Sequence, residues 1–376
     1  MVRIAEIVRE EIGADETLIP DRAPAQEQRD STPREKDVNF RLSSSLADEM
    51  MNRQVASAQT GDVEGHDYSL NEHTEKNYAR LLVVAREVMR NAENGLPLDC
   101  RSVERAAGDL IDEFVSGNEQ LIAAACSPVK GDENYLYAHI VNVTILSLAM
   151  GMDQKLNISK LIDLGVSSFF HDVGITRVLH LVNKQDYLSP SEKGLVREHP
   201  MFGVEILKKT SGISDTVLKV VYQEHERLDG SGYPEGITDA GKLDECSRIV
   251  AVADVFEAIT HRRPHRDGVL PHEAMKRMLG SEEVVKFDSG VLKSLVNRVG
   301  IYPVGSWVRL SNGEVARVVG LNAGRALKPK VKVIFDKDGW KLREARLLNM
   351  ADCDAIQIVK LVGDSELNGY FNRSLI

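Results

Sequence analysis

The sequence contains few cysteines, and none of them are close together. Only four of its 376 residues are cysteine, namely Cys100, Cys126, Cys246 and Cys353, and no two form a Cys-x-x-Cys pair. This spacing excludes a dense disulfide framework and is typical of reduced, partly buried thiols in a cytoplasmic protein.

Long apolar runs and an excess of positive charge are also missing. No stretch approaches the ~18–20 consecutive apolar residues of a membrane span, and the N-terminal "MVRIAEIVREEIG" lacks the uninterrupted apolar core of a signal peptide. The formal net charge is -10, so no broad basic surface indicates DNA or RNA as a partner. With 43% hydrophobic and 28% charged residues, the composition predicts a soluble globular protein.

The N-terminal part divides into two segments. Residues 1–65 predict a short amphipathic helix at 1–14 and a flexible linker, because Pro20–Asp37 is polar, charged and proline-bearing. These 65 residues have too little apolar surface for a core. Residues 66–130 predict a helical region, since two segments show apolar residues at three- and four-residue spacing and end at a glycine.

The last part of the chain has the pattern of β-structure. Within residues 303–376, "SWVRLSNGEVARVVGLN" and "PKVKVIFD" alternate with a period of two, and Asn312-Gly313 is a strong hairpin turn signal. The segment "DAIQIVKLV" predicts a last strand. The sequence therefore predicts a mainly α protein with a helical N-terminal extension and a small C-terminal β-barrel-like or sheet module.

The residues between these parts, 131–302, contain the chemistry. Five helical segments each place histidine, aspartate or glutamate on an otherwise apolar face: His139, His171-Asp172, His199, Glu224-His225 and Asp254. Taken singly, each is explained by a hydrogen-bonded core histidine or a solvated helix end. An unpartnered carboxylate on a buried helix would cost several kcal/mol. Together they favour a site for Fe, Mn, Zn or a similar divalent ion, with Asp172 able to bridge two ions.

This order of residues, followed by "DGSGYP" at Asp229–Pro234, resembles the HD-GYP branch of the HD phosphohydrolase superfamily. The resemblance covers about Asp132–Val299, and β-rich tails are common in such proteins. It implies an all-α catalytic domain at 131–302. It also implies a cytoplasmic bacterial signalling enzyme, a phosphodiesterase that hydrolyses cyclic di-GMP to linear pGpG, GMP or both.

The resemblance also implies roles for individual residues. His171 and Asp172 are the expected catalytic pair, and a hydroxide bridging two divalent ions, Fe or Mn, is the expected nucleophile. The expected ligands are His139, His171, Asp172, His199, Glu224, His225 and Asp254. The signature Gly232, Tyr233 and Pro234 is either a tight turn that holds a tyrosine near the site or a contact for GGDEF-type diguanylate cyclases.

Three positions depart from the family pattern. Tyr135 stands where three-metal members have a glutamate, so two ions are expected rather than three. Glu224 replaces the first of two consecutive histidines, and Ile175 replaces a lysine. These departures leave open a degenerate module that binds cyclic di-GMP or a protein without hydrolysis. Another cyclic dinucleotide, such as cyclic GMP-AMP, is a further alternative substrate.

Arginines are the expected substrate-binding residues. Arg263 and Arg266 in "HRRPHR" match the family's basic residues and would clamp phosphate oxygens. The alternative for this segment is a solvated basic loop. Arg177 lies two residues after Ile175 and is a candidate replacement for the missing lysine. A second copy of the chain, in a homodimer, is a further candidate partner.

Overall fold

The computed structural model describes residues 71–126, 135–182, 184, 188–261, 268–281, 283–322 and 325–373. The helix and linker predicted at residues 1–65 lie outside these ranges, and so do Arg263 and Arg266. The architecture is mainly helical, with a small antiparallel sheet at the C-terminal end, as the sequence predicts.

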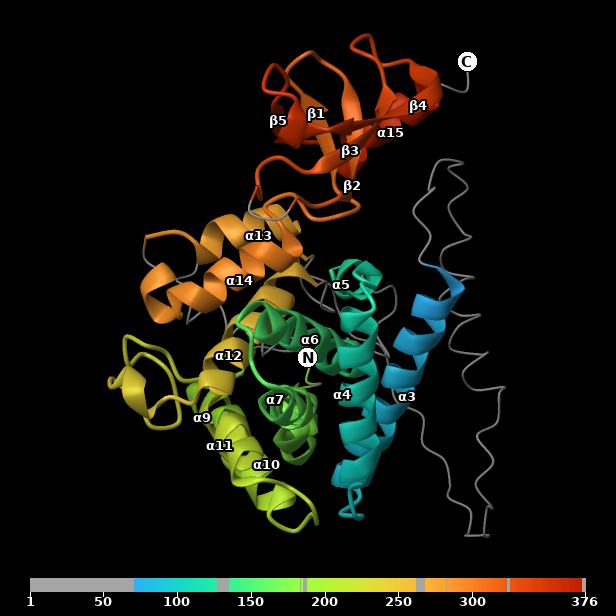
Figure 1. Ribbon diagram of the computed structural model, residues 1–376. Helices are drawn as coiled ribbons and strands as arrows, with labels where there is room; N and C mark the ends of the chain where they lie inside the picture. Colours follow the sequence, from blue (N-terminus) through green and yellow to red (C-terminus); the bar gives the residue numbers. More distant parts are fainter. Residues whose placement is uncertain are drawn as a thin grey trace, which may run out of the picture.

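Helices form most of the described chain (Figure 1). The helices predicted within residues 71–126 are present, and α3 begins where the Asn71 side chain accepts a hydrogen bond from the Thr74 amide at 2.8 Å. The helical elements are α3 (Glu72–Glu93), α4 (Cys100–Val115), α5 (Gln120–Ala125), α6 (Tyr135–Asp153), α7 (Ile158–Phe170), η1 (His171–Val178), α8 (Leu179–Val182), α9 (Pro190–Arg197), α10 (His199–Leu207), α11 (Asp215–Gln223), η2 (Ala240–Lys242), α12 (Glu245–Thr260), α13 (Pro271–Met278), η3 (Val284–Lys286) and α14 (Ser289–Val299).

Helix α6 is the centre of the helical part. It packs against α3, α5, α7, α12 and α14, and nearly all of its residues are buried. By length and composition it could cross a membrane, which corrects the expectation that no stretch approaches a span. However, 89% of its apolar window is buried inside the protein, as expected of a core helix.

The C-terminal strands form one five-stranded antiparallel sheet in the order β4-β3-β2-β1-β5. The strands are β1 (Trp307–Leu310), β2 (Val315–Gly320), β3 (Lys330–Phe335), β4 (Lys341–Asn349) and β5 (Ile358–Leu361), and α15 (Asp364–Arg373) follows them. The β1–β2 connection contains the predicted Asn312-Gly313 turn, where Gly313 has φ +89. Because β4 and β5 end this order, hydrogen bonding among the described strands does not close a barrel.

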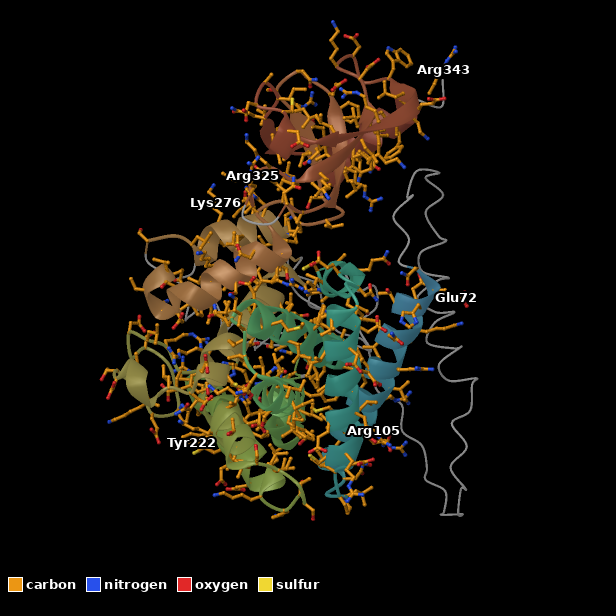
Figure 2. The ribbon with its side chains drawn as sticks, viewed as in Figure 1. Glu72, Arg105, Tyr222, Lys276, Arg325 and Arg343 are labelled. Carbon is orange, nitrogen blue, oxygen red and sulfur yellow. The ribbon has the colours of Figure 1, made fainter. Side chains whose placement is uncertain are left out.

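The sheet lies at one end of the molecule, beyond α13 and α14 (Figure 1). At the junction, the rings of His272 on α13 and Tyr302 stack with centroids 5.1 Å apart. In Figure 2, Arg343 lies at the far end of the module, while Lys276 and Arg325 lie near the junction. The ligand-type residues belong to α6, η1, α10, the end of α11 and α12, so the sheet contributes none of them.

Candidate metal centre

All seven predicted ligands come together in the core of the helical part. None is more than 3% exposed, although every one is polar or ionisable. They form two groups, and within each group one ligand atom from every residue lies within 4.8 Å of the others. The groups are His139, His171 and Asp254, and Asp172, His199, Glu224 and His225.

The first group joins α6, the start of η1 and α12. The Nε2 atoms of His139 and His171 are 3.2 Å apart, and His139 Nε2 lies 3.3 Å from Asp254 Oδ1. Asp254 is on the largely buried helix α12, where the sequence predicts that a carboxylate needs a cation or hydrogen-bond donors. The two imidazoles and this carboxylate therefore face one point.

The second group joins η1, the start of α10 and the residues after α11. His199 Nε2 lies 3.1 Å from both Glu224 Oε1 and His225 Nε2. Pro200 lies in the first turn of α10, where its missing amide hydrogen breaks no helical bond, so His199 can occupy the helix start. This geometry brings Glu224 into the core with 0% exposure and contradicts a solvated helix end.

Asp172 lies between the two groups. Its Oδ2 atom is 3.4 Å from His139 Nε2, while its Oδ1 atom is 3.5 Å from His199 Nε2. Asp254 also spans them, because its Oδ2 atom is 3.6 Å from His225 Nδ1. A carboxylate that presents one oxygen to each group has the geometry needed to bridge two ions.

Three of the histidines are fixed through the ring nitrogen that faces away from the centre. His171 Nδ1 lies 2.7 Å from the Ser168 carbonyl oxygen, and His199 Nδ1 lies 2.8 Å from the Val196 carbonyl oxygen. These carbonyls can only accept, so each Nδ1 donates and each Nε2 faces the centre, where the neutral imidazole presents its lone pair. His139 achieves the same orientation with a carboxylate, Glu257, as the partner of Nδ1.

The charges of the first group and its bridge are strongly coupled. Burial opposes protonation of His139, but the carboxylate of Glu257 and its other acidic neighbours outweigh burial, so its pKa is well above the usual value. Burial also favours the neutral form of Asp172. The imidazoles of His171 and His139 nevertheless hold the pKa of Asp172 well below its usual range.

Burial is the largest influence on the pKa values of Glu224 and His225. Burial raises the pKa of Glu224, and the nearby His171 and His199 offset only part of this effect. Burial lowers the pKa of His225 well below its usual value, so its imidazole is neutral and has a lone pair for a metal. Divalent cations would displace the protons shared within this cluster.

The residues fit a metal centre by a second criterion. Among the described residues, the buried atoms without a hydrogen-bond partner include Asp172 Oδ2, Glu224 Oε2, His225 Nδ1 and Asp254 Oδ2. Buried polar atoms are normally paired, because an unpaired one costs about 1–3 kcal/mol. Four such atoms within the two ligand groups indicate that cations, rather than protein donors, complete the site.

The Gly-Tyr-Pro loop packs directly on the second group. The Tyr233 ring stacks on His225 with centroids 4.7 Å apart, and the Tyr233 amide donates to the His225 carbonyl at 3.1 Å. A Cβ atom at Gly232 would overlap the backbone of His225, Glu226 and Arg227, so this position requires glycine. The loop therefore supports His225.

Two buried charged side chains fix this loop. The Glu226 carboxylate accepts hydrogen bonds from the amides of Glu235 at 2.7 Å and Ile237 at 2.9 Å. The Arg227 guanidinium donates to the Glu224 carbonyl at 3.2 Å and lies over the Phe287 ring. The glycine-rich turn is thus tied to the same backbone that presents Glu224 and His225.

The three departures from the family pattern have different surroundings. Tyr135 is buried one turn before His139, and their rings stack with centroids 6.1 Å apart. Ile175 is 0% exposed and belongs to the main hydrophobic core. A lysine at this position would place its charge in an apolar environment, whereas the isoleucine side chain packs there without that cost.

The predicted substrate arginines are only partly described. Arg177 is about one-third exposed, forms an ion pair with Glu205 of α10 and lies over the Phe202 ring. Its guanidinium is therefore directed to α10.

Sequence reasoning missed the buried polar residues around His139. Glu257 is fully buried and contacts His139, Asn142 and His261, while Asn142 accepts from the Tyr78 hydroxyl at 2.7 Å. The available signal was spacing, since Glu257 follows Asp254 by one helical turn and Asn142 follows His139 in the same way.

Comparisons with known proteins agree with this arrangement. Residues 112–291 match the HD domain family, and residues 307–369 match the family described as a KOW domain associated with an HD domain. The chain is 35% identical over 251 residues to the cyclic di-GMP phosphodiesterase PA4108 of Pseudomonas aeruginosa, covering 66% of this chain and 59% of that protein.

Two further relatives have related names. Identity is 26% over 203 residues to the cyclic di-GMP phosphodiesterase PdeB of Borreliella burgdorferi, covering 54% of this chain and 53% of that protein. It is 30% over 184 residues to the 3'3'-cGAMP-specific phosphodiesterase 1 of Vibrio cholerae, covering 48% and 42%. The matched region is about half the length of these curated relatives.

These findings identify residues 112–291 as an HD domain. This match confirms the HD domain that the resemblance implies, and the order of the ligand-type residues and the sequence Gly232-Tyr233-Pro234 agree with the HD-GYP pattern.

Proposed function

We propose that this protein is a metal-dependent phosphodiesterase that hydrolyses cyclic di-GMP to linear pGpG, GMP or both. The observation that supports this most directly is the position of Asp172. Its two carboxylate oxygens face two separate groups of buried ligand atoms. Dinuclear centres with a shared carboxylate are a common solution for phosphodiester hydrolysis.

The proposed cofactor is a pair of divalent ions, Fe or Mn. One ion would be held by His139, His171 and Asp254, the other by His199, Glu224 and His225, and both by Asp172. Mixed imidazole and carboxylate ligands suit these metals. When bound, the ions supply Lewis acidity to a phosphodiester and lower the pKa of water.

The chain itself contributes orientation and exclusion of water. The hydrogen bonds from His171 Nδ1 and His199 Nδ1 to backbone carbonyls fix the imidazole rings before any ligand binds. The site residues are at most 3% exposed, so the charges act in a medium of low polarity where electrostatic interactions are strong. His171 and Asp172 remain the proposed catalytic pair.

For the substrate, we retain Arg263 and Arg266 as the proposed phosphate clamp. Arg177 already pairs with Glu205, so we assign it the smaller share of phosphate binding. Arginine forks match phosphate oxygens and remain charged at all physiological pH values.

A second candidate substrate is 3'3'-cGAMP, because one relative is named for it. A third reading, binding without hydrolysis, follows from Tyr135, Glu224 and Ile175. The buried position of Glu224 beside His199 supports hydrolysis, because glutamate there can replace an imidazole ligand.

We further propose a cytoplasmic enzyme, with homodimerisation and GGDEF-type diguanylate cyclases as candidate interactions. Tyr233 is 8% exposed and stacks on His225, which favours a supporting role for its ring over direct contact with a partner. A partner would instead meet the exposed Ser231 and Glu235 beside it.

The test of the function is a turnover assay. Protein purified without oxygen is supplied with Fe(II) or Mn(II) and given cyclic di-GMP or 3'3'-cGAMP in parallel. We expect linear pGpG or GMP from wild type and none from Asp172→Ala. Tight cyclic di-GMP binding without product, in metal-loaded wild type, would favour the binding module.

A further inference from the structure

Glu257 is a buried carboxylate that the proposed reaction does not use. It lies on α12, one turn after Asp254, and its side chain is 0% exposed. Its Oε2 atom accepts the hydrogen bond from His139 Nδ1, on the side of the ring that faces away from the centre. A carboxylate at this depth is costly unless it is hydrogen-bonded and close to positive charge.

The other oxygen of Glu257 is anchored separately. Oε1 accepts from Asn142 Nδ2 at 3.1 Å and lies 3.2 Å from His261 Nδ1. Asn142 in turn accepts a hydrogen bond from the Tyr78 hydroxyl at 2.7 Å. These contacts connect α3, α6 and α12, so the orientation of His139 depends on a helix that lies before the matched HD domain.

The acceptor of the Nδ1 hydrogen bond differs between His139 and the other two oriented histidines. His171 and His199 donate to neutral backbone carbonyls within their own segments. His139 donates to a charged group on another helix. A charged acceptor forms a stronger hydrogen bond and makes the imidazole a better metal ligand.

We propose that Glu257, held by Asn142 and Tyr78, is a positioning residue for His139 and thereby controls metal affinity at the His139–His171–Asp254 group. The inference rests on the proposed dinuclear centre. It predicts an effect on one ion, because the ligand that Glu257 contacts, His139, belongs to that group. A purely structural role predicts loss of stability without this selectivity.

The experiment measures Mn(II) binding to chelator-treated protein by electron paramagnetic resonance of free Mn(II), with unfolding followed in parallel. Wild type should bind two ions. Glu257→Gln keeps the size but removes the charge, so affinity for one ion should fall about ten- to hundredfold. Affinity for the other ion should change less than about twofold, and the melting temperature of the metal-free protein, measured in parallel, separates this selectivity from a general loss of stability.

The matched control is Glu113→Gln. Glu113 also pairs with a histidine, His73, and accepts from Asn77 and Asn118, but far from the centre in sequence and on other helices. It should leave both affinities unchanged. Combining Glu257→Gln with Glu224→Gln should weaken both ions, because the two changes act on different groups and should add.

The outcomes separate this inference from the function. If wild type binds two ions and Glu257→Gln binds both with wild-type affinity, the positioning role is wrong and the centre stands. If wild type binds none, both proposals fail. Should Glu257→Gln not fold, Tyr78→Phe replaces it. Loss of one uncharged hydrogen bond should weaken binding of the same ion about fivefold. If Tyr78→Phe bound both ions with wild-type affinity, the inference would be overturned.

Discussion

The two ligand groups both combine imidazoles with carboxylates but are supported by different parts of the fold. In the first, His139 and Asp254 lie within helices α6 and α12, and a buried network from α3 holds His139. In the second, Glu224 and His225 follow the end of α11, and the Gly-Tyr-Pro loop packs on them. The first group therefore depends on helix packing, and the second depends on a loop.

This difference explains the stretch "EHERLDGSGYP". Glu224 and His225 leave the helix and turn into the core, so the backbone after them must fold back sharply. Gly232 permits that close approach, and Glu226 and Arg227 hold it with buried hydrogen bonds. The polar residues at this helix end are therefore held in the core by the loop, whereas those of a solvated helix end would face water.

The largest expected effect comes from the residue common to both groups. Asp172→Ala removes the carboxylate that faces His139 on one side and His199 on the other. We expect loss of both ions and turnover at background level. Metal analysis with a product assay checks this, and retention of one ion at wild-type affinity would show that Asp172 belongs to one group only.

Gly232→Ala should separate the loop-supported group from the helix-supported one. The added methyl group would overlap the backbone of His225 and Arg227, and such overpacking typically costs about 1–3 kcal/mol. We expect a lower free energy of unfolding and weaker binding of one ion. Gly194→Ala, on α9 with open space around its Cβ position, is the matched control. Equal stability of both variants would contradict the proposed packing.

Glu224→Gln should sharpen the comparison further. An amide oxygen is a poorer ligand than a carboxylate, so the ion beside His199 should bind more weakly while the ion beside His139 is retained. Metal titration of the variant measures this directly. Unchanged metal content and activity would show that Glu224 is buried but is not a metal ligand.

The smallest effects concern substrate phosphates. A charged hydrogen bond contributes about 1.5–3 kcal/mol, so Arg263→Ala or Arg266→Ala should weaken cyclic di-GMP binding about ten- to a hundredfold with metal content unchanged. Arg177→Ala should weaken binding less than either variant, because Arg177 already pairs with Glu205. Calorimetric titration ranks the three, and a larger effect at Arg177 would reverse our assignment.

The ligand residues were predictable because each breaks an apolar pattern, as His139 does on α6 and Asp254 does on α12. The residues that hold these ligands in place were not predictable from the sequence. Helix α12 is buried on nearly every face, so no contrast between apolar and polar sides distinguishes Glu257 from its neighbours. The contact of Tyr78 with Asn142 joins residues 64 positions apart, which sequence spacing cannot reveal.

The sheet shows the same limit. Alternating valines and the Asn312-Gly313 turn predicted strands and a hairpin, and β1 and β2 pair as expected. The order of strands depends on which edge the last strand joins. Here β5 pairs with β1, a choice that no local pattern in "DAIQIVKLV" indicates.

The most direct test of the central claim is anomalous scattering from crystals of the protein loaded with Mn(II) or Fe(II). We predict two peaks about 3.5–4 Å apart, one bounded by His139, His171 and Asp254 and the other by His199, Glu224 and His225, with Asp172 between them. A single peak, or a third peak beside Tyr135, would contradict this account.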